Sequence, residues 1–271
     1  MDVEYAAALT TPIPLLTWYV DDHSLLGFID DLVSMHSPPL VTSVSYSLDS
    51  ADQVSREYMD ASSVQFMKVG LMGITLLFAA GDRGVWGFQG IDKGIKFHSE
   101  FPASSPYITS VGATNFQTKS FLGTESAWTC SGGGFSEIYD QPTWQSANVQ
   151  SYLSKAMESN QLPPDMYFNS KGRAYPDLTA VGGPTNPYCV SMGSDEYVGV
   201  SGTSGATSVI GAIIANLNNI RLSMGKPPLG FINPLLYANP QCFKDINHFT
   251  RNNCIPGSFG GFSAIHGWAP A

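Results

Sequence analysis

The fold is decided by one stretch of sequence, Val198-Gly-Val-Ser-Gly-Thr-Ser204-Gly-Ala-Thr-Ser-Val-Ile-Gly-Ala-Ile-Ile214. Its first residues favour a strand, and from Val209 onward apolar residues recur at helical spacing. We expect this helix to end near Gly225, which two prolines follow. Ser204 therefore falls on the first helical turn, where unpaired N–H groups and the helix dipole favour a developing negative charge. The local pattern fits a nucleophilic hydroxyl, but it fits an ordinary N-cap serine better.

The composition favours one large, compact α/β domain. The chain has 271 residues, of which 43% are hydrophobic and only 13% are charged, with 27 glycines and 18 prolines. Such a chain can bury a substantial core and carry many loops. Its net charge of −9 argues against nucleic acid or an anionic membrane surface as a partner. The longest apolar run, residues 71–80, is too short to span a bilayer.

The N-terminus and the cysteines say less about the compartment. The first four residues include two acids, Asp2 and Glu4, where a signal peptide needs a basic region, so no signal peptide is predicted. Cys242 and Cys254 flank a polar loop and are the expected disulfide pair, with free thiols as the alternative. The other two cysteines are Cys130 and Cys189.

Strand-like runs alternate with helical patterns along the chain. Strands are predicted at residues 15–20, 40–46, 74–79, 107–111, 178–181 and 197–200, and helices at residues 2–9, 25–35 and 54–70. Uninterrupted apolar runs are typical of strands covered on both faces, which indicates a parallel sheet flanked by helices. Ligands bind at the carboxyl ends of such strands. Tyr46, Asp82 and Ser204 each follow a predicted strand end and form a candidate site.

A serine nucleophile needs a base, and the sequence offers carboxylates more readily than histidine. None of the five histidines (His23, His36, His98, His248 and His266) lies in the setting of a triad histidine. Carboxylates can serve where their pKa values match the working pH. Asp2 opens a predicted helix and Asp82 follows a buried strand. Taken singly, each is better explained as a helix-terminus or turn residue.

Eight blocks of sequence, taken together in chain order, carry a more specific signal than any single residue. They are Met1-Asp-Val-Glu-Tyr5, Val44-Ser-Tyr46, Thr75-Leu-Leu-Phe-Ala-Ala-Gly-Asp82, Phe101-Pro-Ala-Ser-Ser-Pro-Tyr107, Ser131-Gly-Gly-Gly-Phe-Ser136, Gly172-Arg-Ala-Tyr-Pro-Asp177, Ser201-Gly-Thr-Ser204 and Gly225-Lys-Pro-Pro-Leu-Gly-Phe-Ile-Asn-Pro234. In this order they resemble the sedolisin (serine-carboxyl) peptidases, and in particular the tripeptidyl-peptidase branch. The resemblance extends from Met1 to about Trp268.

The resemblance implies a fold, a chemistry and a setting. The fold is α/β, with a subtilisin-like parallel sheet flanked by helices. Ser204 matches the family's nucleophile, Asp2 the aspartate that supports a glutamate base, and Asp82 the aspartate that helps to bind the oxyanion. Asp82 must carry a proton to donate a hydrogen bond, so an acid-acting enzyme is expected. The implied substrates are peptides or unfolded proteins, in a lysosomal or secreted acidic compartment.

The chain also departs from the family pattern at its N-terminus. The family's glutamate stands four residues before the aspartate that Asp2 matches, which falls upstream of Met1. Glu4 is a poor replacement, because two residues along a helix turn a side chain about 200° around the axis. We therefore expect residues 1–271 to form a single peptidase catalytic domain that is incomplete at its N-terminus, lacks the family's leading strands and is clipped at its C-terminus.

A calcium site near the C-terminus is a second implication of the resemblance. The family's site combines two aspartates with backbone carbonyls. Asp245 supplies the first carboxylate here, and Ile246 and Gly267, with the neighbouring residues 265 and 266, match the carbonyl donors. Ala269 stands where the second aspartate is expected. Because Ca²⁺ prefers six or more oxygens with anionic help, binding is predicted to be weakened, and an ordinary loop acid is the alternative for Asp245.

Three functions remain open at this point. The first is an acid-acting serine-carboxyl peptidase that releases tripeptides from peptide N-termini or cleaves internally. The second is a catalytically inactive homologue that binds peptides, which the absent glutamate favours. The third is a peptidase with a Ser-His-Asp triad, which requires a histidine close to Ser204.

Overall fold

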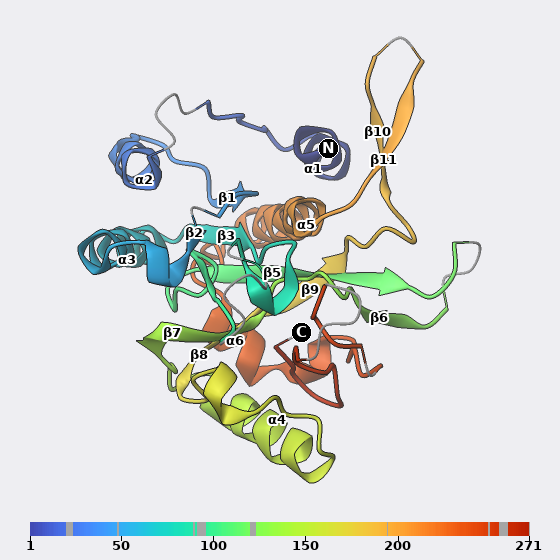
Figure 1. Ribbon diagram of the computed structural model, residues 1–271. Coiled ribbons are helices and arrows are strands. Elements are labelled where there is room, and N and C mark those ends of the chain that lie inside the picture. The colour runs from blue at the N-terminus through green and yellow to red at the C-terminus, as the bar shows by residue number, and fades with distance from the viewer. Residues whose placement is uncertain are drawn as a thin grey trace.

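The computed structural model describes residues 1–19, 24–47, 49–88, 90, 96–119, 123–193, 195–248, 250–254 and 260–270. Its centre is a five-stranded sheet with helices on both sides (Figure 1). Strands β1 (Val41–Val44), β3 (Thr75–Ala79), β5 (Thr109–Phe116) and β9 (Leu178–Val181) pair in parallel, and β6 (Glu125–Ala127) pairs antiparallel with β5. The predicted α/β fold with a parallel sheet is confirmed.

The two faces of β3 show why the sheet lies between helices. All five residues of this strand are buried, and successive side chains point to opposite faces. Leu76 and Phe78 pack in one hydrophobic cluster with Phe66, whereas Leu77 packs in another with Ile210. Phe66 belongs to α3 (Arg56–Leu71) and Ile210 to α5 (Thr203–Ser223), so each face of the strand is covered by a helix.

The remaining elements surround this core. The helices are α1 (Asp2–Thr10), α2 (Leu25–Ser34), α4 (Ser146–Glu158) and α6 (Asn233–Ala238), with short 3₁₀ turns at Ala51–Gln53, Gly84–Trp86, Asp165–Tyr167 and Pro240–Cys242. Three antiparallel pairs lie outside the main sheet: β2 (Asp49–Ser50) with β4 (Glu100–Phe101), β7 (Gly134–Asp140) with β8 (Gly172–Tyr175), and β10 (Tyr188–Ser191) with β11 (Tyr197–Val200).

Two sequence predictions about strands need correction. Residues 15–19 form no strand, and the last residue of that predicted strand lies outside the described residues. Leu15 and Leu16 are largely exposed there, and an extended segment needs a neighbouring strand to pair its backbone groups. The strand at 197–200 is present, but it belongs to the β10–β11 hairpin rather than to the parallel sheet.

The predicted disulfide is also wrong. Cys254 pairs with Cys130, while Cys242 and Cys189 are free and exposed. The backbone N–H of Cys254 donates to the carbonyl of Thr129 at 2.9 Å, which brings the two cysteine Cα atoms to 4.2 Å from each other. The bond joins residues 124 positions apart, so proximity along the chain was a misleading guide.

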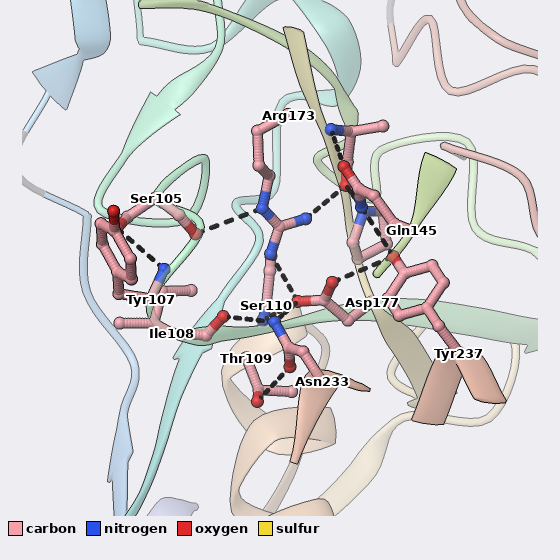
Figure 2. A network of polar contacts seen from close by, with 12 residues as sticks. Ser105, Tyr107, Ile108, Thr109, Ser110, Gln145, Arg173, Asp177, Asn233 and Tyr237 are labelled. Carbon is pink, nitrogen blue, oxygen red and sulfur yellow. Dashed lines mark hydrogen bonds and ion pairs between the residues drawn. The ribbon is translucent and has the colours of Figure 1, made fainter. Parts of the chain in front are cut away.

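A buried polar network joins strand β5 of the main sheet to strand β8 and helix α6 (Figure 2). The Arg173 guanidinium lies 2.6 Å from the Asp177 carboxylate, and both side chains are fully buried. The same carboxylate accepts hydrogen bonds from the N–H of Ser110 at 2.7 Å and from the hydroxyl of Tyr237 at 3.0 Å. Asn233 also donates to it, at 3.3 Å. The network therefore ties β8, β5 and α6 together around one buried charge pair.

Candidate active site

Ser204 lies inside helix α5, one residue after its start. Gly202 occupies the N-cap position, so the interpretation of Ser204 as the N-cap is wrong. Gly202 has φ +157°, and a side chain there would meet the Asp82 carboxylate at 2.9 Å. The Ser204 hydroxyl is half-buried and donates a long hydrogen bond, 3.4 Å, to the carbonyl of Ser45. The hydroxyl therefore stands at the helix N-terminus, where the dipole favours negative charge.

Asp82 follows β3 and is held against the same helix start. One carboxylate oxygen accepts hydrogen bonds from both the backbone N–H and the hydroxyl of Thr203, at 2.7 and 2.8 Å. The Thr203 hydroxyl in turn accepts from the N–H of Gly81 at 3.2 Å. These contacts fix the orientation of the carboxyl group beside the residue that precedes Ser204.

One cavity of about 250 Å³ brings the predicted strand-end residues together. Tyr46, Asp82 and Ser204 all line it; Tyr46 and Asp82 follow β1 and β3, neighbouring strands of the parallel sheet, and Ser204 lies at the start of α5. We call it the Ser204 pocket; its lining residues are Ser45, Tyr46, Ser47, Ala79, Gly81, Asp82, Arg83, Phe88, Glu100, Thr203 and Ser204. A hydroxyl and a carboxyl group thus line one open pocket, which is large enough for a reacting carbonyl.

Asp2 lies outside the lining of the Ser204 pocket, on helix α1. Its Oδ1 atom is buried and has no hydrogen-bond partner among the described residues. It lies near Tyr188, whose ring packs in turn against Gly205. Burial, and to a smaller extent the neighbouring Tyr5 and Asp2, raise the pKa of Tyr188 to about 12. Tyr188 therefore lies between Asp2 and Gly205 in this set of contacts, while Glu4 accepts a hydrogen bond from the N–H of Ser191 at 3.1 Å.

Histidine contributes nothing to the described part of this pocket. None of the four described histidines lines it, and His23 lies outside the described residues. His266 instead pairs with Asp245. The described geometry gives no support to a Ser-His-Asp triad.

The sequence interpretation missed Glu100, a buried acid of the Ser204 pocket. Glu100 is only 1% exposed, accepts a hydrogen bond from the Ser47 hydroxyl, and donates its own N–H to the Tyr175 hydroxyl at 3.1 Å. A signal was present, because Glu100 directly precedes the quoted block that begins at Phe101. An acid at that position points into the fold only because β4 pairs with β2.

A second carboxyl group, that of Glu137, lies behind this region. Burial raises its pKa, and hydrogen bonds from the N–H and hydroxyl of Ser99 oppose part of the rise. Burial also raises the pKa of Tyr175, and the charges of Glu100 and Glu137 add to that effect. Two acids therefore lie close to one buried tyrosine.

Glu137 should make the fold more stable in acid. Its pKa is higher in the folded than in the unfolded chain, so the folded state binds the proton more tightly. The stabilisation is complete below the unfolded pKa and is lost as the pH rises through the folded pKa. We expect Glu137→Gln to flatten the fall in Tm between about pH 4 and about pH 7. Thermal unfolding across this range measures it, with the exposed Glu158→Gln as control; equal pH slopes in both variants would contradict the prediction.

Two of the predicted calcium ligands, Asp245 and Gly267, are hydrogen-bonded to each other. Both Asp245 oxygens accept from the N–H of Gly267, at 3.1 Å, and the same carboxylate pairs with His266. Within the described ranges, no group of three or more His, Cys, Asp or Glu side chains could hold a metal ion. Gly267 presents a donor rather than an acceptor to Asp245, and Ala269 has no carboxylate. Asp245 is therefore the one carboxylate among the residues of the expected site, and calcium prefers more anionic help than that.

Chelation should therefore have little effect on stability. Because Asp245 already has hydrogen-bond donors in place of a cation, we expect excess calcium and a chelator to give the same Tm to within about 1 °C. Differential scanning fluorimetry of the wild-type chain and Asp245→Asn measures this. A calcium-dependent rise in Tm that disappears in Asp245→Asn would show that the loop rearranges to bind the ion.

Comparisons with known proteins agree with this geometry. The Subtilase family model matches residues 29–227. Tripeptidyl-peptidase 1 of Rattus norvegicus is 40% identical over 282 residues, covering all of this chain and 48% of the relative. Physarolisin of Physarum polycephalum is 34% identical over 319 residues, covering all of this chain and 53% of the relative. The chain thus spans about half the length of these relatives.

A solved structure has a fold similar to that of this chain. Pseudomonas sedolisin, a serine-carboxyl proteinase complexed with pseudo-iodotyrostatin, superimposes with a TM-score of 0.68 at 22% identity, covering 93% of this chain and 66% of that one. A serine at the start of a helix with a carboxyl group beside it, on an α/β sheet, is an arrangement that serine peptidases use. The chain belongs to the Subtilase family.

One further finding concerns membranes. Among the described helices, none combines the length and the apolar character that crossing a bilayer would require.

Proposed function

We propose that this chain carries the nucleophile and the oxyanion site of a serine-carboxyl peptidase that hydrolyses peptides in acid. The observation that supports this most is the shared Ser204 pocket, in which Asp82 is fixed by Thr203 beside the nucleophilic serine. Ser204 attacks the scissile carbonyl, and its hydroxyl proton passes to the base. Protonated Asp82 and a backbone N–H near Ser204 then donate hydrogen bonds to the oxyanion.

Asp2 supports the base in this proposal. The family's base is a glutamate four residues before Asp2, which is not a residue of this sequence. Helix α1 packs beside α5, where Asn216 donates to the carbonyl of Leu9 at 2.9 Å. A carboxylate one helical turn before Asp2 would lie on the same face of α1, because residues four apart share a face. In this proposal Asp2 orients that base.

The substrate is a peptide or an unfolded protein, and the reaction either releases N-terminal tripeptides or cleaves internally. The family resemblance favours tripeptide release in a lysosomal or secreted acidic compartment. The Cys130–Cys254 disulfide supports an oxidising compartment, since such bonds persist outside the cytosol. Residues 1–271 act as one catalytic domain in this proposal.

A second candidate is a homologue that binds peptides without cleaving them. The observation in its favour is that the Ser204 hydroxyl donates to the carbonyl of Ser45 rather than to a described carboxylate, while the Ser204 pocket is already formed. An oxyanion site and a cleft retain peptide affinity even without a base.

One experiment separates the two candidates. The full-length gene product is incubated with a fluorogenic tripeptide amide from about pH 3 to about pH 7, and binding of the same peptide is measured by calorimetry. The peptidase predicts turnover that is fastest in acid, together with a covalent peptide-aldehyde adduct that mass spectrometry locates on Ser204. Binding with neither turnover nor adduct would favour the peptide-binding homologue, and the absence of both binding and turnover would refute both candidates.

A further inference from the structure

Hydrogen bonds join the β10–β11 hairpin to helix α1. The Tyr5 hydroxyl donates to the carbonyl of Cys189 at 3.2 Å and accepts from the N–H of the same residue at 2.9 Å. The Tyr5 hydroxyl therefore binds both backbone polar groups of Cys189. Glu4 adds a contact to Ser191, two residues further along β10. Figure 1 shows the hairpin extending from the body of the molecule beside the N-terminal helix.

The same hairpin leads directly to the nucleophile. Strand β11 ends at Val200, four residues before Ser204, and Val200 pairs with Tyr188 across the hairpin. The Tyr188 ring lies so close to Gly205 that a Cβ there would meet it at 2.3 Å. Its hydroxyl donates to the carbonyl of Val181, at the end of β9. Tyr188 thus fixes the base of the hairpin to both the main sheet and the first turn of α5.

The two tyrosines connect these contacts. The rings of Tyr5 and Tyr188 meet edge to face, with centroids 4.6 Å apart. Tyr5 is one turn of α1 from Asp2, and Tyr188 is the ring against the residue that follows Ser204. Edge-to-face pairs fix orientation as well as distance. A continuous chain of contacts therefore extends from the helix of Asp2, through two aromatic rings, to the nucleophile turn.

We propose that the β10–β11 hairpin sets the position of Asp2 relative to Ser204, with Tyr5 and Tyr188 as positioning residues. The proposal rests on the proposed function, in which these two side chains must act together. Neither tyrosine touches the reacting atoms. Their effect is to hold α1 in one register against α5, and a shift of about 1 Å in such a geometry is enough to slow a reaction substantially.

The test uses Tyr5→Phe and Tyr188→Phe, which remove a hydroxyl and keep the ring. Tyr197→Phe is the matched control, because Tyr197 lies on the same hairpin and is 66% exposed. Hydrogen exchange of α1 and of residues 201–205 reports the local coupling. A peptide aldehyde reports the chemistry: the Ser204 oxygen bonds to the aldehyde carbon, the carbonyl π bond breaks, and the serine proton ends on the new hemiacetal oxygen. The corresponding peptide alcohol reports binding without that bond.

We expect exchange in α1 to become about fivefold faster in Tyr5→Phe, because two hydrogen bonds are lost. Aldehyde affinity should fall about five- to tenfold in both variants while alcohol affinity stays unchanged, since only the covalent step needs the positioned acid. Tyr197→Phe should change neither quantity.

Either of two results would overturn the proposal. In the first, Tyr5→Phe changes neither measurement: the exchange rate in α1 and the ratio of aldehyde to alcohol affinity both stay within about twofold of wild type. The other is the same loss in Tyr197→Phe. If the wild-type chain forms no adduct on Ser204, the proposed function fails, and exchange in α1 alone decides whether the hairpin positions this helix.

Discussion

Ser204→Ala is expected to abolish peptide hydrolysis, with a fall in kcat of about 10⁴-fold or more. The substitution removes the hydroxyl oxygen that forms the acyl bond in the proposed mechanism, while the small alanine fits the first turn of α5 without strain. The Asp82–Thr203 contacts do not involve the Ser204 side chain, so the oxyanion site should remain assembled. Cleavage of a tripeptide amide in acid, followed with and without the substitution, measures the effect.

Ser208→Ala is the control for this result. Ser208 lies one turn further along α5 and donates its hydroxyl to the carbonyl of Ser204 at 3.1 Å. Loss of that bond should change kcat by less than about tenfold, because an intrahelical serine bond contributes little. KM should remain similar in Ser204→Ala if any residual turnover can be measured. Equal activity in Ser204→Ala and wild type would assign the reaction to another residue.

The candidate site was predictable where chemistry follows from strand order. Tyr46 and Asp82 are far apart in sequence, but the parallel strands β1 and β3 place their carboxyl ends at one edge of the sheet, and Ser204 lines the same pocket from the start of α5. The apolar run 74–79 indicated the central strand because a strand buried on both faces needs apolar residues throughout. Local patterns and strand topology were therefore sufficient for the core of the fold and for the Ser204 pocket.

The remaining features depend on contacts that no local pattern encodes. Glu100 enters the pocket through the pairing of β4 with β2, two strands of two residues each. Cys254 meets Cys130 because loops distant in sequence lie side by side. Residues 15–19 have strand-like composition, but a strand also needs a partner for its backbone groups. Tertiary pairing decided each of these cases.

The network of Figure 2 gives the second large effect, this time on stability. Arg173→Met is expected to lower the free energy of unfolding by about 3–5 kcal/mol. The Asp177 carboxylate would then be buried without its cation, although Ser110 and Tyr237 would still donate to it. The lost bond from Arg173 to the Ser105 carbonyl, 3.2 Å long, adds to the cost. Urea unfolding of both proteins measures the difference.

The chain contains its own control for this prediction. Arg56 and Asp60 form a pair with the same four-residue spacing and a 2.9 Å contact, but their side chains are 59% and 53% exposed. Water already solvates both charges there, so Arg56→Met should cost only about 0–1 kcal/mol. Should Arg173→Met fail to fold, Arg173→Lys keeps the charge and loses the second donor, and should lie between the two. If Arg173→Met were no more harmful than Arg56→Met, burial could not be what makes the Arg173–Asp177 pair important.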